Sequence, residues 1–169
     1  FNNDFNVDDF FKISEPLIKK EFSRIMSLKD GLKKMSKSEI SDLSRINLTD
    51  DKDTIVKKIK KAKTDALPIP STIEELEKRP ETKNLVGIFS SLAGLTIENS
   101  LNEFSGKNFS HFKENLSQLL IEKIIPISFE IKKLLNDHNY LDSILIDGCK
   151  KADKIASEKV KKIHEIIGF

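Results

Sequence analysis

The sequence predicts a mainly α-helical chain, in which the C-terminal edge of an α/β layer is followed by an all-α bundle. Two observations support this fold class. From residue 49 to the end, apolar side chains recur at three- and four-residue spacing, which is typical of amphipathic helices. Residues 24–28 alternate as a short strand does, and proline or glycine separates several of the segments. The chain has no internal repeat and no low-complexity tract.

The composition indicates a soluble globular protein. The 169 residues are 38% hydrophobic and 33% charged, and no apolar run approaches the roughly 20 residues that cross a membrane. Cys149 is the single cysteine, which excludes an internal disulfide and favours a reducing, cytoplasmic location. The chain opens at Phe1 without a methionine or a recognisable domain start. We therefore expect it to be the C-terminal part of a longer protein.

The charge is small overall but unevenly distributed. The net charge is +2, yet residues 31–63 hold ten Lys/Arg against five Asp/Glu, and residues 64–125 hold six against nine. A basic segment beside an acidic one predicts a polarised surface that meets a polyanion on one side.

The first half of the chain is predicted to begin without a helix. Pro16 discourages a helix around it, and residues 24–28 form a strand. Gly31 is expected to turn the chain into a Lys/Ser segment. A helix then starts with Thr49 as its N-cap and runs to about Lys63, with three acidic residues at its start and a buried stripe of Ile55, Val56 and Ile59.

Three further helices are predicted between residues 71 and 106. Pro68 and Pro70 form an extended linker, and the capping box Ser71-Thr72-Ile73-Glu74 starts a short helix that Pro80 ends. A second helix carries Leu85 to Leu92 and stops at Gly94, and a third is capped by Thr96 and closed by Gly106.

The C-terminal part is predicted to hold the two longest helices. One starts near Ser110 and contains Pro126, which should kink it. The last carries apolar residues from Leu141 to Ile167, and its Ala152 and Ala156 would allow close approach of a neighbouring helix.

The residues with the clearest chemical potential are Lys34-Met35-Ser36-Lys37-Ser38, which we name the Lys/Ser loop. Two ammonium groups and two hydroxyls on a short flexible stretch are suited to holding phosphate oxygens. Such contacts accelerate a reaction when they strengthen in the transition state. On charge alone, a solvated surface turn is the more common explanation of such a run.

The surrounding sequence changes that balance. Arg24-Ile25-Met26-Ser27-Leu28, the Lys/Ser loop and Ser44-Arg45-Ile46-Asn47-Leu48 together resemble class I aminoacyl-tRNA synthetases, and most of all the bacterial and organellar tryptophanyl type. The resemblance continues through Asn84-Leu85-Val86-Gly87 to Ala152-Asp153-Lys154, so it covers nearly the whole chain. It implies that residues 1–48 are the C-terminal remnant of a Rossmann-like catalytic domain, and that residues 49–169 are a helical anticodon-binding domain.

The resemblance also implies roles for individual residues. Lys34 and Lys37 would steady the ATP phosphates while a tryptophan carboxylate attacks the α-phosphate and pyrophosphate leaves. Ser36 and Ser38 would add hydroxyl contacts to ATP, Met35 would anchor the loop by packing, and Ile25 would lie against the adenine. The implied partners are ATP with Mg²⁺, tryptophan, tRNA and a second copy of the full-length protein, and no membrane.

Two departures limit what the resemblance implies. Glu39-Ile40 stands where many relatives have Asp-Pro. The resemblance therefore does not imply a stiff backbone at the point where the chain leaves the loop. The His-Gly type ATP-binding signature, the second nucleotide-binding loop and the aspartate that reads the indole nitrogen are absent from these 169 residues. Alone, the chain is expected to bind ATP poorly and to form no aminoacyl-adenylate.

The other residues that could carry chemistry are better explained by structural roles. The three histidines are far apart without ligand spacing, Cys149 has no nearby histidine, and no Gly-rich phosphate loop is present. The acids at residues 50–53 suit a helix start better than a metal, and lysines 57–61 suit a solvated helix face better than an RNA contact. Two alternative functions stay open: a non-catalytic helical RNA-binding module, and tyrosyl instead of tryptophanyl specificity.

Overall fold

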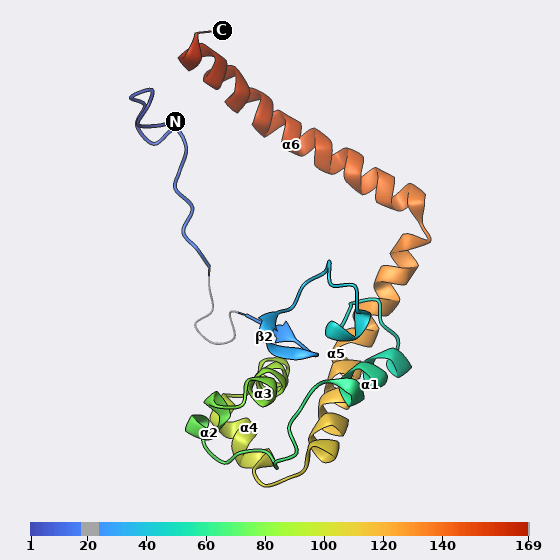
Figure 1. The fold of residues 1–169 in the computed structure, drawn as a ribbon. Coiled ribbons are helices and arrows are strands. Elements are labelled where there is room, and N and C mark those ends of the chain that lie inside the picture. The colour runs from blue at the N-terminus through green and yellow to red at the C-terminus, as the bar shows by residue number, and fades with distance from the viewer. Residues whose placement is uncertain (18–23, 169) are drawn as a thin grey trace. The chain divides into compact units, whose positions relative to one another are not determined.

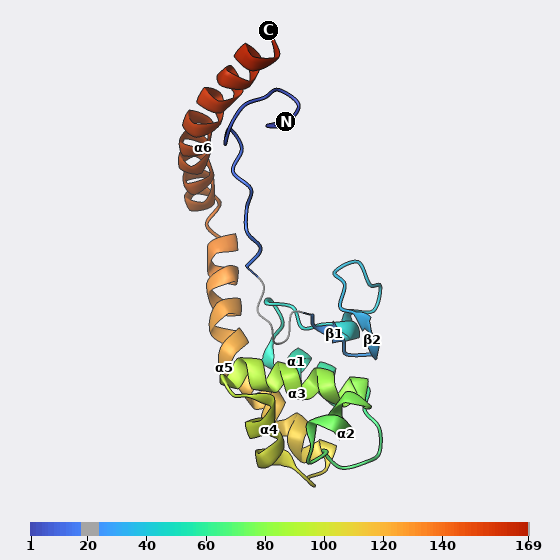
Figure 2. The same cartoon turned by 90° about the vertical axis from the view of Figure 1, so that its left-hand side faces the viewer.

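A computed structural model describes residues 1–17 and 24–168 and confirms the mainly α-helical class. The chain divides into two compact units (Figures 1 and 2). One unit spans Lys19–Lys132, and the other combines Phe1–Ile18 with Lys133–Phe169. The domain boundary at residue 48, drawn from the resemblance, stays a prediction. No helix in the described ranges combines the length and apolarity that a membrane crossing requires.

The first unit begins with a small hairpin and a loop. Strands β1 (Met26–Ser27) and β2 (Asp30–Lys34) pair in antiparallel fashion, and a short 3₁₀ helix η1 (Asp42–Ser44) follows the Lys/Ser loop. The strand predicted at residues 24–28 is confirmed, but only Met26 and Ser27 form it. Gly31 does not form the turn that we expected, because it lies inside β2, and the turn lies between the two strands. Among the described residues this hairpin is the only sheet.

Helix α1 (Lys52–Lys61) starts later than its predicted cap. The side chain of Asp51 accepts a hydrogen bond from the Thr54 backbone N–H, so Asp51 and not Thr49 is the N-cap. A carboxylate at this position satisfies a free N–H and also interacts favourably with the helix dipole, which explains the shift. Ile55 and Ile59 are fully buried, as predicted, whereas Val56, the third residue of the predicted stripe, is only half-buried.

Helix α2 (Ile73–Glu77) confirms a short helix but shifts its capping box by one residue. Thr72 Oγ1 accepts from the Glu75 backbone N–H at 3.2 Å, and Glu75 Oε2 accepts from the Ser71 backbone N–H at 3.3 Å. Pro80 does not end α2. It is the first residue of α3 (Pro80–Ala93), where proline is tolerated because its missing N–H would have no helical partner.

The next helices follow the sequence signals closely. Gly94 ends α3 in the left-handed conformation at φ 69°, and Thr96 caps α4 (Ile97–Phe104) by accepting from the Asn99 backbone N–H. Helix α5 (Phe109–Leu135) continues through Pro126, and the kink expected there stays a prediction. The predicted helices at these three places are confirmed.

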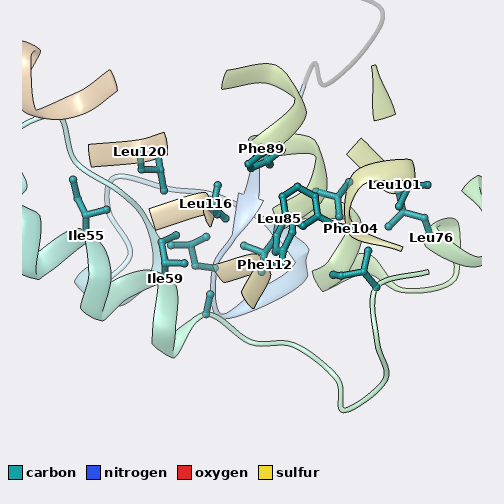
Figure 3. Packing of buried hydrophobic residues seen from close by; sticks show 14 of the residues in the cluster. Ile55, Ile59, Leu76, Leu85, Phe89, Leu101, Phe104, Phe112, Leu116 and Leu120 are labelled. Carbon is teal, nitrogen blue, oxygen red and sulfur yellow. The ribbon is translucent and has the colours of Figure 1, made fainter. Parts of the chain in front are cut away.

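The core of the first unit lies between α1, α3, α4 and α5 (Figure 3). Its centre is aromatic: the ring of Phe104 lies edge-on to Phe89 at 4.9 Å and to Phe112 at 5.0 Å. Such edge-to-face contacts add to the gain from burying the rings. Phenylalanines at these positions therefore pack the interior, as their spacing predicted.

In the second unit, α6 (His138–Ile167) is capped by Asp137, which accepts from the Tyr140 backbone N–H at 3.0 Å. Helix α6 contains no buried residue, so its place in the predicted bundle stays a prediction. The ammonium of Lys159 lies 3.7 Å from the ring centre of Phe10 and donates to the Phe10 carbonyl, which joins the N-terminal segment to α6.

Candidate functional site

The Lys/Ser loop leaves the hairpin at a well-ordered point. Lys34 is the last residue of β2 and is paired with Met26, and the Met35 backbone N–H donates to the Ile25 carbonyl at 3.1 Å. Asn84 of α3 provides hydrogen-bond partners for the β1 backbone. Its side-chain amide donates to the Met26 carbonyl and accepts from the Met26 N–H, both at 2.9 Å. The entry to the loop is thereby fixed to α3.

Gly31 permits the close approach of the hairpin to α3. A Cβ at this position would lie 2.5 Å from the Glu81 nitrogen and 2.6 Å from the Pro80 carbonyl carbon. Real Cβ atoms do not come this close to backbone, so any other residue would push β2 away from the start of α3.

The loop itself presents its polar groups to solvent. Lys34, Ser36, Lys37 and Ser38 are exposed, and in the described structure neither ammonium group forms an ion pair. The two serine hydroxyls lie 3.0 Å apart, and the Ser38 backbone N–H donates to Ser36 Oγ at 3.3 Å. Two cations and two hydroxyls can therefore turn toward one anionic ligand.

The apolar side of the site is formed by Ile25 and Met35. Ile25 is 45% exposed, and Met35 packs against the core of the first unit. Both border a groove of about 360 Å³ whose lining is almost wholly aliphatic. The other lining residues come from the hairpin turn, the segment after η1, α1, α3 and α5: Leu28, Ile46, Ile59, Ile88, Ser91, Leu92, Leu120 and Ile124.

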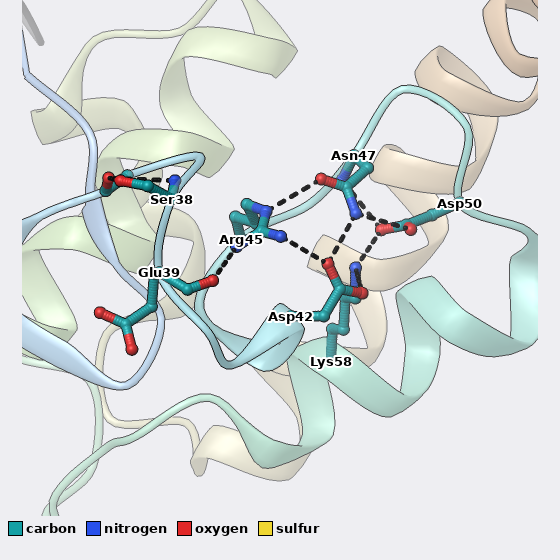
Figure 4. A network of polar contacts seen from close by, with 8 residues as sticks. Ser38, Glu39, Asp42, Arg45, Asn47, Asp50 and Lys58 are labelled. Carbon is teal, nitrogen blue, oxygen red and sulfur yellow. Dashed lines mark hydrogen bonds and ion pairs between the residues drawn. The ribbon is translucent and has the colours of Figure 1, made fainter.

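The exit of the loop is held by Arg45. Its guanidinium donates to the Glu39 carbonyl at 2.9 Å and to Asn47 Oδ1 at 3.2 Å, and it lies 3.2 Å from Asp42 Oδ1 (Figure 4). Asn47 Nδ2 donates in turn to Asp42 Oδ1 at 2.8 Å. The backbone at Glu39 is thus tied to the segment that leads into α1.

Behind Arg45 lies a buried lysine. The ammonium of Lys58 is 2.6 Å from Asp42 Oδ2 and 2.7 Å from Asp50 Oδ2, and only 2% of its side chain is exposed. Hydrogen bonds from Lys58 and Asn47 hold the pKa of the Asp42 carboxyl below its ordinary value. The prediction that Lys58 lies on a solvated helix face is therefore wrong.

A signal for its burial was present in the sequence. Lys58 follows Ile55 by three residues and precedes Ala62 by four, so it belongs to the apolar stripe of α1. Arg45 and Asn84 were also not identified individually, because their partners lie in loops or strands that periodicity does not place.

Other titratable groups are better explained by structure than by chemistry. No cluster of three His, Cys, Asp or Glu residues that could hold a metal occurs in the described parts of the chain. Lys113 of α5 donates to the Ala62 carbonyl at 2.7 Å and so caps the C-terminus of α1, and burial lowers the pKa of its ammonium. Cys149 is exposed on α6.

Comparison with known sequences agrees with the residues of the loop. A family model described as "tRNA synthetases class I (W and Y)" matches residues 1–124. The tryptophan–tRNA ligase of Mesorhizobium japonicum is 51% identical over 163 residues, which cover 96% of this chain and 46% of that protein. The corresponding ligase of Caulobacter vibrioides is 47% identical over 169 residues, 100% of this chain and 49% of that protein. The chain thus spans about half the length of the curated relatives it matches.

Solved structures give the same result. The tryptophanyl-tRNA synthetase of Mycoplasma pneumoniae aligns with 99% of this chain and 49% of its own, at a TM-score of 0.76 and 25% identity. That of Campylobacter jejuni complexed with ADP and tryptophan aligns with 99% of this chain and 50% of its own, at a TM-score of 0.67 and 28% identity. The chain therefore belongs to the class I tRNA synthetases of the tryptophan and tyrosine group.

Proposed function

We propose that the chain contributes the phosphate-holding loop and the helical part of a tryptophan–tRNA ligase. The full-length enzyme would activate tryptophan with ATP and transfer it to its tRNA. One observation carries the proposal: Lys34 and Lys37 are exposed on a loop whose entry and exit are both fixed by hydrogen bonds. Family membership agrees with this assignment.

The residues of the loop suit the adenylation step. A tryptophan carboxylate oxygen attacks the α-phosphorus, the bond from that phosphorus to the bridging oxygen breaks, and pyrophosphate leaves with the electron pair. Lys34 and Lys37 would neutralise the charge that grows on the leaving group, and Ser36 and Ser38 would donate hydrogen bonds to it. These interactions strengthen as the bond breaks, so they accelerate the reaction itself.

The nucleotide base would lie at the apolar side of the site. Ile25 is half-exposed beside Met35, and the backbone of residue 25 is held by the hairpin. An apolar strand edge can cover one face of a purine while its backbone donors and acceptors read the base edge. ATP is the substrate in this assignment, and Ile25, Lys34, Met35, Ser36, Lys37 and Ser38 are its proposed contacts.

Mg²⁺ would reach the site bound to ATP. In the described ranges no group of carboxylates forms a cation site, so none of these residues is proposed as a metal ligand and no step is assigned to the ion. The remaining partners are tryptophan, which would be bound by residues outside this chain, a tRNA, and a second copy of the full-length protein.

The domain assignment follows the same proposal. Residues 1–48 would belong to the Rossmann-like catalytic domain and residues 49–169 to the helical anticodon-binding domain, acting in the cytoplasm, where translation takes place.

Tryptophan-dependent exchange of pyrophosphate into ATP by the full-length protein tests the proposal. The Lys37→Ala variant should reduce kcat by about 10²–10³, because one charged transition-state contact is lost. Lys33→Ala is the matched control: Lys33 is adjacent, its side chain is 78% exposed, and its activity loss should stay within about twofold. A Lys37→Ala enzyme that keeps the wild-type kcat would overturn the role of the loop.

The same assay separates the alternatives. The matching family model covers both tryptophan and tyrosine enzymes, so exchange that depends on tyrosine would overturn the tryptophan assignment. Binding of tRNA without exchange by either amino acid would identify a non-catalytic RNA-binding module.

A further inference from the structure

The Lys/Ser loop is anchored at its two ends by different kinds of contact. Its entry is part of the hairpin, through the bond from the Met35 N–H to the Ile25 carbonyl. Its exit has no strand partner and no proline, and the side chain of Ile40 is fully exposed. The exit is instead held by the guanidinium of Arg45 on the Glu39 carbonyl at 2.9 Å.

Arg45 is itself held in place by a balanced group of charges. Its side chain is 18% exposed and pairs with Asp42, and Asp42 pairs with the buried ammonium of Lys58. Asp50, whose side chain is 7% exposed, is the second carboxylate on Lys58. The two cations and two anions neutralise one another, and their mutual attraction offsets the cost of removing the Lys58 side chain from water.

The network also joins the loop exit to a rigid frame. The Leu28 backbone N–H donates to the Ser44 carbonyl at 2.9 Å, and the Leu28 carbonyl accepts from the Lys63 N–H at 2.8 Å. The hairpin turn, η1 and the end of α1 are therefore bonded to one another. Against this frame, a movement of Arg45 would displace the backbone of Glu39, two residues after Lys37.

We propose that Arg45 is a positioning residue for Lys37, and that Asp42 and Lys58 hold its guanidinium so that α1 sets the exit of the Lys/Ser loop. This inference rests on the proposed function. Its physical basis is that a displacement of about 1 Å in a group that stabilises a transition state can cost about 10²-fold in rate.

The test uses the full-length protein in tryptophan-dependent pyrophosphate exchange. Arg45→Gln should lower kcat about tenfold, with the KM for tryptophan within about twofold of wild type, because the amino acid is bound elsewhere. Arg45→Lys should recover part of the loss, since an ammonium can still donate to the Glu39 carbonyl. A matching loss is expected for Asp42→Asn, which changes a half-exposed side chain and should fold normally.

Two controls separate positioning from general damage. Lys57→Met removes an exposed lysine beside Lys58 and should leave kcat within about twofold. In a Lys37→Ala background, Arg45→Gln should cost less than about twofold, because the group that it positions is gone. An undiminished tenfold loss in that background, or a full wild-type rate for Arg45→Gln alone, would overturn the proposal.

The outcome is distinguishable from a failure of the proposed function. If the wild-type protein shows no tryptophan-dependent exchange, or if Lys37→Ala is fully active, the function itself is wrong. If wild type exchanges, Lys37→Ala is impaired and Arg45→Gln behaves as wild type, the function stands and Arg45 has no positioning role.

Discussion

The side-chain amide of Asn84 forms two hydrogen bonds with the backbone of Met26, one to its nitrogen and one to its oxygen, each 2.9 Å long. Asn84 is 3% exposed and stands 58 residues away in sequence. It completes the edge of β1 as a neighbouring strand would, and so attaches the hairpin that carries the Lys/Ser loop to α3.

Replacing Asn84 with leucine should therefore destabilise the hairpin. Both polar atoms of Met26 would lose their partners in a partly buried place, at a cost of about 2–4 kcal/mol. Hydrogen exchange in the full-length protein should show faster exchange at Met26 and at its strand neighbours. Asn102→Leu, at an exposed position of α4, is the control and should leave these amides unchanged. Unaltered protection at Met26 in Asn84→Leu would refute the role of the amide.

Gly31→Ala should separate β2 from the start of α3. The added methyl would lie 2.5 Å from the Glu81 nitrogen, and relief of that overlap should cost about 1–3 kcal/mol in the free energy of unfolding. Gly148→Ala on α6 is the opposite case, because nothing lies within 4 Å of its added methyl. There alanine should stabilise by about 0.5–1 kcal/mol through its better helix propensity. Urea unfolding of the full-length variants measures both changes in the free energy of unfolding. If Gly31→Ala left this free energy unchanged, the close approach of β2 to α3 would be contradicted.

The contribution of Glu81 should depend on pH. Its carboxylate lies 2.7 Å from the Lys63 ammonium, and this hydrogen bond, with those from its own N–H and that of Gly31, holds the pKa of Glu81 below its ordinary 4.5. A lowered folded-state pKa stabilises the fold above the unfolded-state value, and the effect is lost as the pH falls through the folded-state value. Glu81→Gln should thus be less stable than wild type at pH 7, by about 0.5–1 kcal/mol.

The difference should shrink below pH 4.5, because the protonated Glu81 becomes as neutral as glutamine. Urea midpoints of both proteins between pH 7 and about 3 give this difference directly, since the other carboxyl groups titrate in both. Glu103→Gln, at an exposed position of α4, serves as the comparison. If the difference in stability between wild type and Glu81→Gln stayed constant over this pH range, the ion pair with Lys63 could not be the cause of that difference.

Arg79 should fasten the proline-containing linker. Its guanidinium meets Asp65 through Nε at 2.8 Å and Nη2 at 2.5 Å, and it donates to the Pro68 carbonyl at 2.7 Å. Lysine cannot reproduce this two-pronged geometry, so Arg79→Lys should lose about 1–3 kcal/mol and expose the linker to proteases. The neighbouring exposed Lys78→Ala should leave the rate of cleavage unchanged. Equal cleavage of Arg79→Lys and wild type would show that the linker is held by other contacts.

The sequence predicted local structure better than contacts between distant segments. Thr96 and Gly94 mark helix ends through chemistry confined to a few residues, and both were correct. Thr49 failed as a cap because a carboxylate two residues later satisfies the helix start better. Lys58 lies on the apolar stripe of α1, but lysine is expected on the surface by default, and its pairing with Asp42 and Asp50 became visible only in the fold.

The candidate site divides in the same way. Its chemical groups, the ammoniums and hydroxyls of the Lys/Ser loop, are contiguous and were predicted directly. The groups that hold them, Asn84 and Arg45, act through contacts to backbone atoms of other segments. No periodicity in a single sequence encodes which carbonyl a guanidinium will reach, so the supports of the loop became visible only in the fold.

Pinning both ends of the Lys/Ser loop also limits how much conformational entropy a ligand must remove. Between the bonded Met35 nitrogen and the bonded Glu39 oxygen, only Ser36, Lys37 and Ser38 lie fully inside the span. Fixing the backbone of a freely moving residue costs about 1–2 kcal/mol, so a short tethered span spends far less of the ligand's affinity on ordering than a long untethered one. Release of either tether would therefore weaken capture even where every ammonium and hydroxyl is kept.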